Sequence, residues 1–114
     1  MQPIRILIVA PYPTLQYGLR AAVESADELE VTGLAADLEQ VLAFIDEDPV
    51  DLLLADADWS VAELQALAEL PEAPPLTLLT EDPTVAAELL LAGAQAVLPR
   101  DATPEEIVAA LRAR

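Results

Sequence analysis

The sequence contains no cysteine and no histidine. This absence excludes disulfides, thiolate nucleophiles, imidazole bases and the usual zinc ligands. Any chemistry of the 114-residue chain must therefore use carboxylates, hydroxyl groups or the backbone. Long apolar runs are missing too, since no segment approaches the roughly 20 residues that span a bilayer. The first residues, MQPIR, lack the pattern of a signal peptide, so we expect a soluble, cytoplasmic protein without membrane contact.

Positive charge is scarce. The five basic residues, all arginine, stand against 21 acidic residues and give a formal net charge of −16. A field of this sign repels phosphate backbones, so we expect no direct binding of nucleic acid by this chain. The charge favours basic protein partners, although a strongly acidic surface also serves solubility alone.

Apolar runs of strand length alternate with segments of helical period along the whole chain, which predicts an α/β domain spanning residues 1–114. Five helices are expected, and the second should bury Leu38, Val41, Leu42 and Ile45. The expected strands are Ile4 to Val9, Glu30 to Ala35, Val50 to Ala55, Leu76 to Leu79 and Ala96 to Leu98.

Capping residues mark the expected helix boundaries. Helix starts are indicated by Asp37, by the capping boxes Ser60 with Glu63 and Thr103 with Glu106, and by Asp82 before Pro83; Gly93 indicates a helix end.

The first, third and fourth strands are continuous apolar runs, as expected for strands covered by helices on both faces. Right-handed crossovers then give a doubly wound parallel sheet of five strands in the flavodoxin-like order 2-1-3-4-5. In such a sheet the functional crevice lies beyond the carboxyl ends of the strands, at the switch point between strands 1 and 3.

Several residues stand where the strands end at this crevice. Ala10 and Pro11 follow the first strand and Asp56 follows the third, with Asp58 two residues later. Thr80 ends the fourth strand and precedes Glu81, and Arg100 comes just after the fifth. With the segments GLRAAVES, PVDLLLAD and LLLAGAQAVLPRDATPEEIVAAL, the whole chain resembles the receiver domain of response regulators, in the form that precedes LuxR-type DNA-binding domains.

The resemblance implies that Asp56 occupies the phosphoacceptor position, that Thr80 is the hydroxyl residue of the switch and that Arg100 replaces a lysine. It also implies that the acidic pair that holds magnesium falls on Ala10 and Pro11, so both carboxylates are missing. Two like charges ~4 Å apart repel by ~4 kcal/mol at an effective dielectric of ~20. A phosphoaspartate beside Asp58 and Glu81 without a metal ion is therefore costly.

Further departures from the family pattern affect the switch itself. The segment DADWSVAEL is shorter than the family's loop and lacks its proline and its Asp-Gly pair. Glu81 replaces a small residue, and Val97 stands where many receivers carry an aromatic residue. Asp58 and Glu81 either rebuild a metal site from new directions, because a hard cation needs only oxygen ligands, or belong to the general acidity.

Other positions have two interpretations each. Asp56 either accepts phosphate or is an inherited carboxylate that interacts with Arg100, and we favour the second. Thr80 either binds phosphate or simply ends a strand. Trp59 is either an anchor for a partner or a cover for the shortened loop. Leu91 is the residue of the leucine run most exposed by helical geometry; it either contributes to an interface or lies under the C-terminal segment.

These observations predict a pseudo-receiver: a phosphorylation-independent interaction or dimerisation module of a response regulator, without catalytic activity and without a cofactor. Its context would be signal transduction and transcription regulation in a two-component system, with a protein partner or a second copy. One alternative is a functional receiver that binds magnesium through an unusual site at Asp56. A small-molecule-binding flavodoxin-like domain is a weaker alternative, because VAPYPT and ADADWS contain no glycine.

Overall fold

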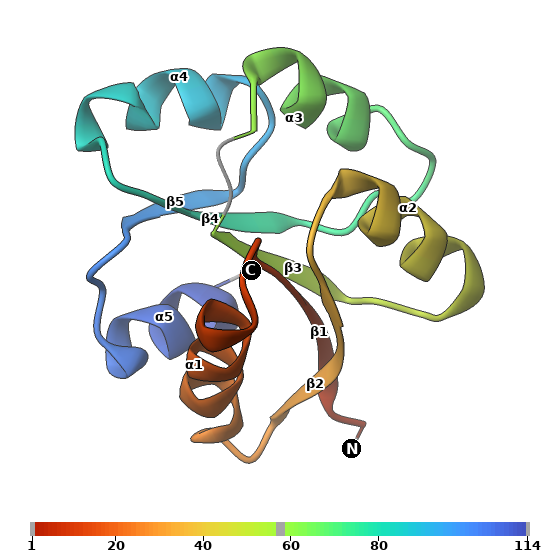
Figure 1. Cartoon of the computed structure of the whole chain (residues 1–114), viewed down its shortest axis with the longest axis vertical. Coiled ribbons are helices and arrows are strands. Elements are labelled where there is room, and N and C mark those ends of the chain that lie inside the picture. The colour runs from red at the N-terminus through yellow and green to blue at the C-terminus, as the bar shows by residue number, and fades with distance from the viewer. Residues whose placement is uncertain (1, 57–58, 114) are drawn as a thin grey trace.

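The computed structural model of the protein describes residues 2–56 and 59–113. Strands and helices alternate along the chain, with one 3₁₀ turn, η1, before the fourth helix (Figure 1). In order they are β1 (Ile4–Val9), α1 (Pro13–Glu24), β2 (Leu29–Ala35), α2 (Leu38–Glu47), β3 (Leu52–Asp56), α3 (Val61–Ala68), β4 (Leu76–Thr80), η1 (Pro83–Val85), α4 (Ala86–Leu91), β5 (Ala96–Pro99) and α5 (Pro104–Arg112).

The five strands form one parallel sheet in the order β2-β1-β3-β4-β5. This confirms the predicted flavodoxin-like arrangement. Helices α1 and α5 lie on one face of the sheet, and α2, α3 and α4 lie on the other (Figure 1). No helix in the described residues is both long enough and apolar enough to cross a membrane.

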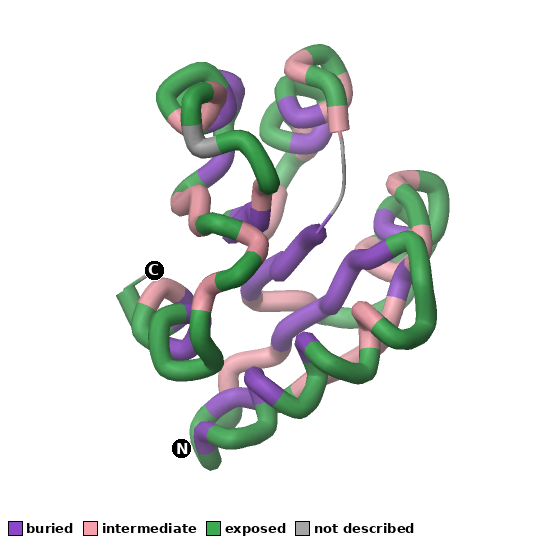
Figure 2. The backbone as a smooth tube through the Cα atoms, turned by 60° about the vertical axis from the view of Figure 1, so that its left-hand side comes forward, coloured by how far each residue is buried: buried purple, intermediate pink, exposed green. Residues whose placement is uncertain are grey.

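The core consists of two apolar layers, one on each face of the sheet. Strand β1 supplies both, because its side chains alternate: Ile6 and Ile8 pack toward α1 and α5, and Leu7 and Val9 pack toward α2, α3 and α4. All four are completely buried. The central strands are accordingly the most buried part of the backbone trace in Figure 2. Burial on both faces explains why these strands read as uninterrupted apolar runs.

Three of the four predicted helix starts carry their caps, and the fourth, at Asp82, begins a 3₁₀ turn. The Asp37 carboxylate accepts a hydrogen bond from the backbone N–H of Gln40 at 2.9 Å at the start of α2. Both capping boxes form, one at the start of α3 and one at the start of α5. These local interactions satisfy N–H groups that would otherwise lack partners at a helix start, so they fix where the helices begin.

Several details differ from the sequence expectations. Strand β3 begins at Leu52 rather than Val50, and the segment after Asp82 starts with a 3₁₀ turn before α4. Leu42 is 41% exposed instead of buried. The aromatic ring of Phe44 lies against Gly33 of β2, where a Cβ atom would come within 2.3 Å of the ring. Phe44 thus covers the sheet at α2, and Leu42 lies largely in solvent.

Candidate functional site

The five parallel strands end along one edge of the sheet, and four of these ends carry a residue singled out from the sequence. Ala10 follows β1, Asp56 ends β3, Thr80 ends β4 and Arg100 follows β5. Parallel pairing of β1 with β3, of β3 with β4 and of β4 with β5 places these positions along the same edge. The fold therefore assembles the positions that the sequence placed at the switch point.

The end of β1 carries no charge. Ala10 is completely buried; its N–H donates to the Ala35 carbonyl oxygen at 3.0 Å, and its carbonyl accepts from Gln16 Nε2 at 2.9 Å. Pro11 is exposed and has no N–H group. Hydrogen bonds therefore tie this strand end to β2 and α1, while its alanine and proline side chains offer no ligand to a cation.

Asp56 lies in a buried ion pair. Its side chain is only 3% exposed, and its Oδ1 lies 2.6 Å from Nε of Arg100, whose side chain is 28% exposed. A carboxylate at this depth requires a compensating charge, because burial of an unpaired charge is very costly. The contact confirms the expected interaction with Arg100, whereas the role of Asp56 as a phosphoacceptor stays a prediction.

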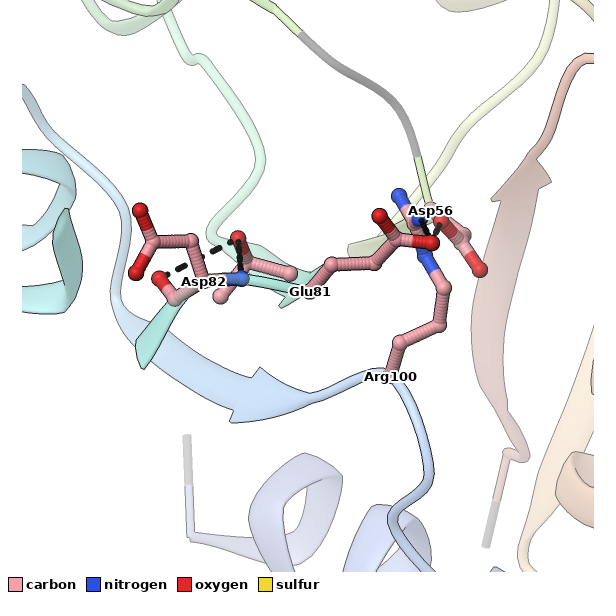
Figure 3. A network of polar contacts seen from close by, with 5 residues as sticks. Asp56, Glu81, Asp82 and Arg100 are labelled. Atoms are coloured by element: carbon pink, nitrogen blue, oxygen red, sulfur yellow. Dashed lines mark hydrogen bonds and ion pairs between the residues drawn. The ribbon is translucent and has the colours of Figure 1, made fainter. Parts of the chain in front are cut away.

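A second carboxylate binds the same guanidinium group. Oε1 of Glu81 lies 2.6 Å from Nη1 of Arg100, although the Glu81 side chain is 76% exposed. In Figure 3 the Arg100 side chain extends from the end of β5 between the Asp56 and Glu81 carboxylates. We refer to Asp56, Glu81 and Arg100 as the arginine clamp. It joins β3, the segment after β4 and the segment after β5 through one cation.

The positive charge of Arg100 in the clamp is permanent. Burial alone would lower the pKa of the Arg100 guanidinium group, but the hydrogen bond with Glu81 and the attraction of the Asp56 and Glu81 carboxylates outweigh it. The net effect raises the pKa of Arg100 above its ordinary value, so the group stays protonated. The clamp therefore holds a fixed positive charge beside Asp56.

Glu81 was one of two residues proposed to rebuild a metal site. It contacts Arg100, the same cation that binds Asp56. Its proposed companion, Asp58, lies outside the described residues, so the rebuilt site stays a prediction. Within residues 2–56 and 59–113, no three acidic side chains form a group suited to a metal ion.

Thr80 organises the turn that follows β4. Its Oγ1 accepts a hydrogen bond from the backbone N–H of Asp82 at 3.2 Å. The Asp82 carboxylate in turn accepts from the N–H and the Oγ1 of Thr84, at 3.0 and 2.5 Å. These two hydrogen bonds lower the pKa of the Asp82 carboxyl group. The Thr80 hydroxyl thus has a structural role here, and its role toward phosphate stays a prediction.

A pocket of about 310 Å³ opens beside the clamp. Thr80 and Glu81 line it from the end of β4, and Pro99, Arg100 and Asp101 line it from the end of β5. The guanidinium group of the clamp contributes positive charge here, while Glu81 and Asp101 contribute negative charge. A bound anion in this pocket would therefore meet both attraction and repulsion.

Comparison with known proteins extends the description of the fold. No family model matches the chain. Two curated relatives match most of it: a protein-glutamate methylesterase/protein-glutamine glutaminase of Anaeromyxobacter dehalogenans, 32% identical over 110 residues, and the response regulator UvrY of Escherichia coli, 28% identical over 116 residues. These alignments cover 89% and 96% of this chain but 32% and 53% of the relatives. The chain thus spans about a third and about half of their lengths.

The signal receiver domain of the response regulator NarL from Mycobacterium tuberculosis has the same fold, with a TM-score of 0.87 at 22% sequence identity. That comparison covers 99% of this chain and 96% of the NarL domain. Sequence and fold together support a response-regulator receiver domain. The order of strands, the position of Asp56 at the end of β3 and the position of Thr80 at the end of β4 fit that assignment.

The remaining predicted positions of the receiver domain lie on the α3 and α4 side of the sheet. Trp59 and Val97 are half-buried against the core layer beneath α2, α3 and α4. Leu91 is 89% exposed, so the alternative in which it lies under the C-terminal segment is wrong. Leu90, beside it on α4, is 44% exposed. The two leucines form an exposed apolar patch on the receiver domain, and its role as an interface stays a prediction.

Sequence reasoning missed the link between Glu81 and Arg100. It treated Glu81 as a neighbour of a phosphoryl group or as a metal ligand, and it paired Arg100 with Asp56 alone. The predicted strand order already placed β4 beside β5. This could have indicated the contact between Glu81 and Arg100, because residues that follow neighbouring parallel strands lie close together. In this receiver domain that adjacency completes the clamp.

Proposed function

We propose that this receiver domain is a pseudo-receiver, an interaction module that signals without phosphorylation of Asp56. The observation that supports the proposal is the arginine clamp, with Nε of Arg100 2.6 Å from Asp56 and Nη1 2.6 Å from Glu81. The protein itself thus supplies a cation to the carboxylate that would receive a phosphoryl group. Ala10 and Pro11 provide no carboxylates to hold a metal ion beside it.

The charges around Asp56 favour a pseudo-receiver over a receiver that accepts a phosphoryl group. A phosphoryl group on Asp56 would have to displace the guanidinium group or share it, and Glu81 would then lie beside the added negative charge. Magnesium usually neutralises such charge while held by one or two protein carboxylates. Arginine is not equivalent to a compact ammonium group at a tight phosphate site, because its donors form a rigid planar fork rather than a point charge.

The alternative proposal is a functional phosphoacceptor receiver with an unusual magnesium site at Asp56. One observation favours it: Asp56 and Thr80 occupy the ends of adjacent strands, with a pocket of about 310 Å³ beside Thr80. In that case Asp56 would release Arg100 when the metal ion and the phosphoryl group bind. The two proposals therefore differ in whether the clamp opens.

As an interaction module, the domain would have no catalytic activity of its own. The partner would be another protein or a second copy of the chain, and the exposed Leu91 supplies one apolar contact for it. A role in transcription regulation and a cytoplasmic location are further parts of this proposal, and a nucleic acid would not bind this strongly acidic domain directly.

The test uses Trp59, the only tryptophan of the chain, as a fluorescent reporter near the switch point. Magnesium is titrated first, and beryllofluoride is then added as a phosphoryl mimic. The pseudo-receiver proposal expects no saturable change in emission while circular dichroism reports a folded protein. A saturable change that requires magnesium and disappears in Asp56→Ala would establish the alternative.

A matched variant shows whether the assay can detect binding. Ala10→Asp combined with Pro11→Asp restores two carboxylates at the end of β1, and we expect it to bind magnesium if it folds. An Asp56→Ala change in this background should abolish that response. Phosphorylation is measured independently by intact mass spectrometry after incubation with acetyl phosphate. We expect the parent protein to gain no phosphoryl group.

A further inference from the structure

A second hollow lies on the other side of Thr80, between α3 and α4. It measures about 320 Å³ and is formed by the start of α3, the end of β4 and the segment from Asp82 to Leu89. We refer to it as the α3–α4 crevice. Apart from Thr80 it shares no lining residue with the pocket beside the clamp. Ligand binding in the α3–α4 crevice is therefore separable from phosphorylation or metal binding at Asp56.

The floor and one wall of the crevice are apolar. Leu78 and Leu89 are nearly completely buried, and Val85 is half-buried beside them. Trp59 is half-buried and lines the crevice from the start of α3. A tryptophan ring attracts a cation placed over its face, and arginine is the side chain that most often occupies this position. The crevice thus suits an aliphatic stem that carries a cationic end.

Two carboxylates line the same crevice, one from α3 and one from the segment after β4. Glu63 of α3 uses Oε1 to accept from the N–H of Ser60 at 3.1 Å, and Asp82 uses Oδ1 to accept from Thr84. Among the described residues, no hydrogen bond involves the second oxygen of either carboxylate. Each side chain can therefore cap its own turn with one oxygen and bind a ligand with the other.

Positive charge is absent from the lining of this crevice. Within the part of the chain that the structure describes, the arginines pair elsewhere: Arg5 with Asp51, Arg20 with Glu24, Arg112 with Glu28, and Arg100 in the clamp. The whole chain carries a formal charge of −16. Long-range attraction and the local carboxylates therefore both favour a basic ligand.

We propose that the α3–α4 crevice binds an arginine side chain of a basic partner protein. The guanidinium group stacks on Trp59 and binds Glu63 and Asp82, while the aliphatic stem contacts Leu78, Val85 and Leu89. An arginine meets each requirement, because its planar group both stacks on aromatic rings and binds carboxylates. The proposal goes beyond the pseudo-receiver function and holds whether or not Asp56 accepts a phosphoryl group.

The binding test uses the full 114-residue chain at low salt. The probe is a capped five-residue peptide with a central arginine between two leucines and an alanine at each end. A second peptide carries citrulline, which keeps the shape of arginine without its charge. We expect a saturable change in Trp59 fluorescence with the arginine peptide, and binding at least ~10-fold weaker with citrulline.

Two isosteric changes remove the carboxylate charges while they preserve the local fold. Glu63→Gln keeps the capping box, since glutamine serves in that position as glutamate does. Asp82→Asn keeps an oxygen that accepts from Thr84. We expect the double variant to bind the arginine peptide at least ~10-fold more weakly. The matched control, Glu47→Gln with Asp48→Asn on the exposed end of α2, has the same net charge and should bind as the parent does.

Three results would overturn the proposal. The first is the absence of saturable binding by the arginine peptide to the folded parent protein. The second is equal weakening in the matched control, which would mean that overall charge alone attracts the peptide. The third is equal affinity for arginine amide and for the peptide, which would assign the crevice to a small free cation rather than to a partner protein.

Discussion

Replacement of Arg100 by methionine removes the cation of the clamp and keeps most of the side-chain length. The direct consequence falls on Asp56, which is 3% exposed and would lose the guanidinium group that lies 2.6 Å from its Oδ1. Glu81 is 76% exposed, so its carboxylate can turn into water at little cost. The destabilisation therefore comes from a carboxylate that stays buried while its compensating charge is gone.

The size of the effect follows from the exposure of the two partners. Removal of one partner of a fully buried ion pair costs about 3 to 5 kcal/mol, whereas removal of an exposed pair costs less than about 1 kcal/mol. The Arg100 side chain is 28% exposed, so water can reach the vacated position and solvate Asp56 in part. An intermediate loss of about 2 kcal/mol is expected. For a chain of this length that corresponds to a melting temperature about 6 to 10 °C lower.

The assay is urea unfolding followed by Trp59 fluorescence and by circular dichroism. Arg20→Met is the matched control, because Arg20 forms an exposed ion pair with Glu24 on α1 and its loss changes the net charge equally. It should lower the free energy of unfolding far less than Arg100→Met does, because an exposed ion pair contributes little. The double variant Asp56→Asn with Arg100→Met removes the buried charge as well, so it should be more stable than Arg100→Met alone.

Either of two outcomes would refute this reasoning. If Arg100→Met and Arg20→Met lower the free energy of unfolding by the same amount, the clamp acts only as a surface ion pair. If the double variant with Asp56→Asn is no more stable than Arg100→Met, the cost does not arise from an uncompensated carboxylate.

Three further changes test other parts of the structure. Gly33→Ala places a Cβ within 2.3 Å of the Phe44 ring and should lower the free energy of unfolding by about 1 to 3 kcal/mol, measured by urea unfolding. The pKa of Asp82 is lower in the folded protein than in the unfolded chain. Its contribution to stability is therefore complete above the pKa of the unfolded chain and is lost as the pH falls through the pKa of the folded protein. Asp82→Asn should therefore flatten the acid limb of a plot of urea midpoint against pH. Leu91→Gln should change the free energy of unfolding by less than about 0.5 kcal/mol, because Leu91 is 89% exposed, while sedimentation should show weaker self-association.

Gly18→Ala is a control for the first of these predictions, and each of the three has an outcome that would contradict it. Gly18→Ala should be neutral or stabilising, because nothing lies within 4 Å of the added Cβ, and an equal loss in both glycine variants would contradict the contact with Phe44. An acid limb that is as steep in Asp82→Asn as in the parent would contradict the lowered pKa of Asp82. Self-association that is unchanged in Leu91→Gln would exclude the leucine patch as an interface between copies.

The order of the elements and the boundaries of most helices could be predicted from the sequence alone. Strand order follows from runs of apolar residues and from the handedness of the crossovers, and helix starts follow from caps such as Ser60 with Glu63. The absence of carboxylates at Ala10 and Pro11 also required no structure. These features depend on residues a few positions apart, or on a rule that holds for any parallel sheet.

Which side chains meet could not be predicted without the packed structure. Arg100 binds Glu81 as well as Asp56, and Phe44 covers Gly33 where Leu42 was expected to be buried. Each contact joins residues that lie well apart in the sequence, so the sequence alone leaves the choice of partner open. The choice depends on the direction of each Cα–Cβ bond and on the space left by neighbouring elements, and these are set by the packing of the whole sheet and its helices.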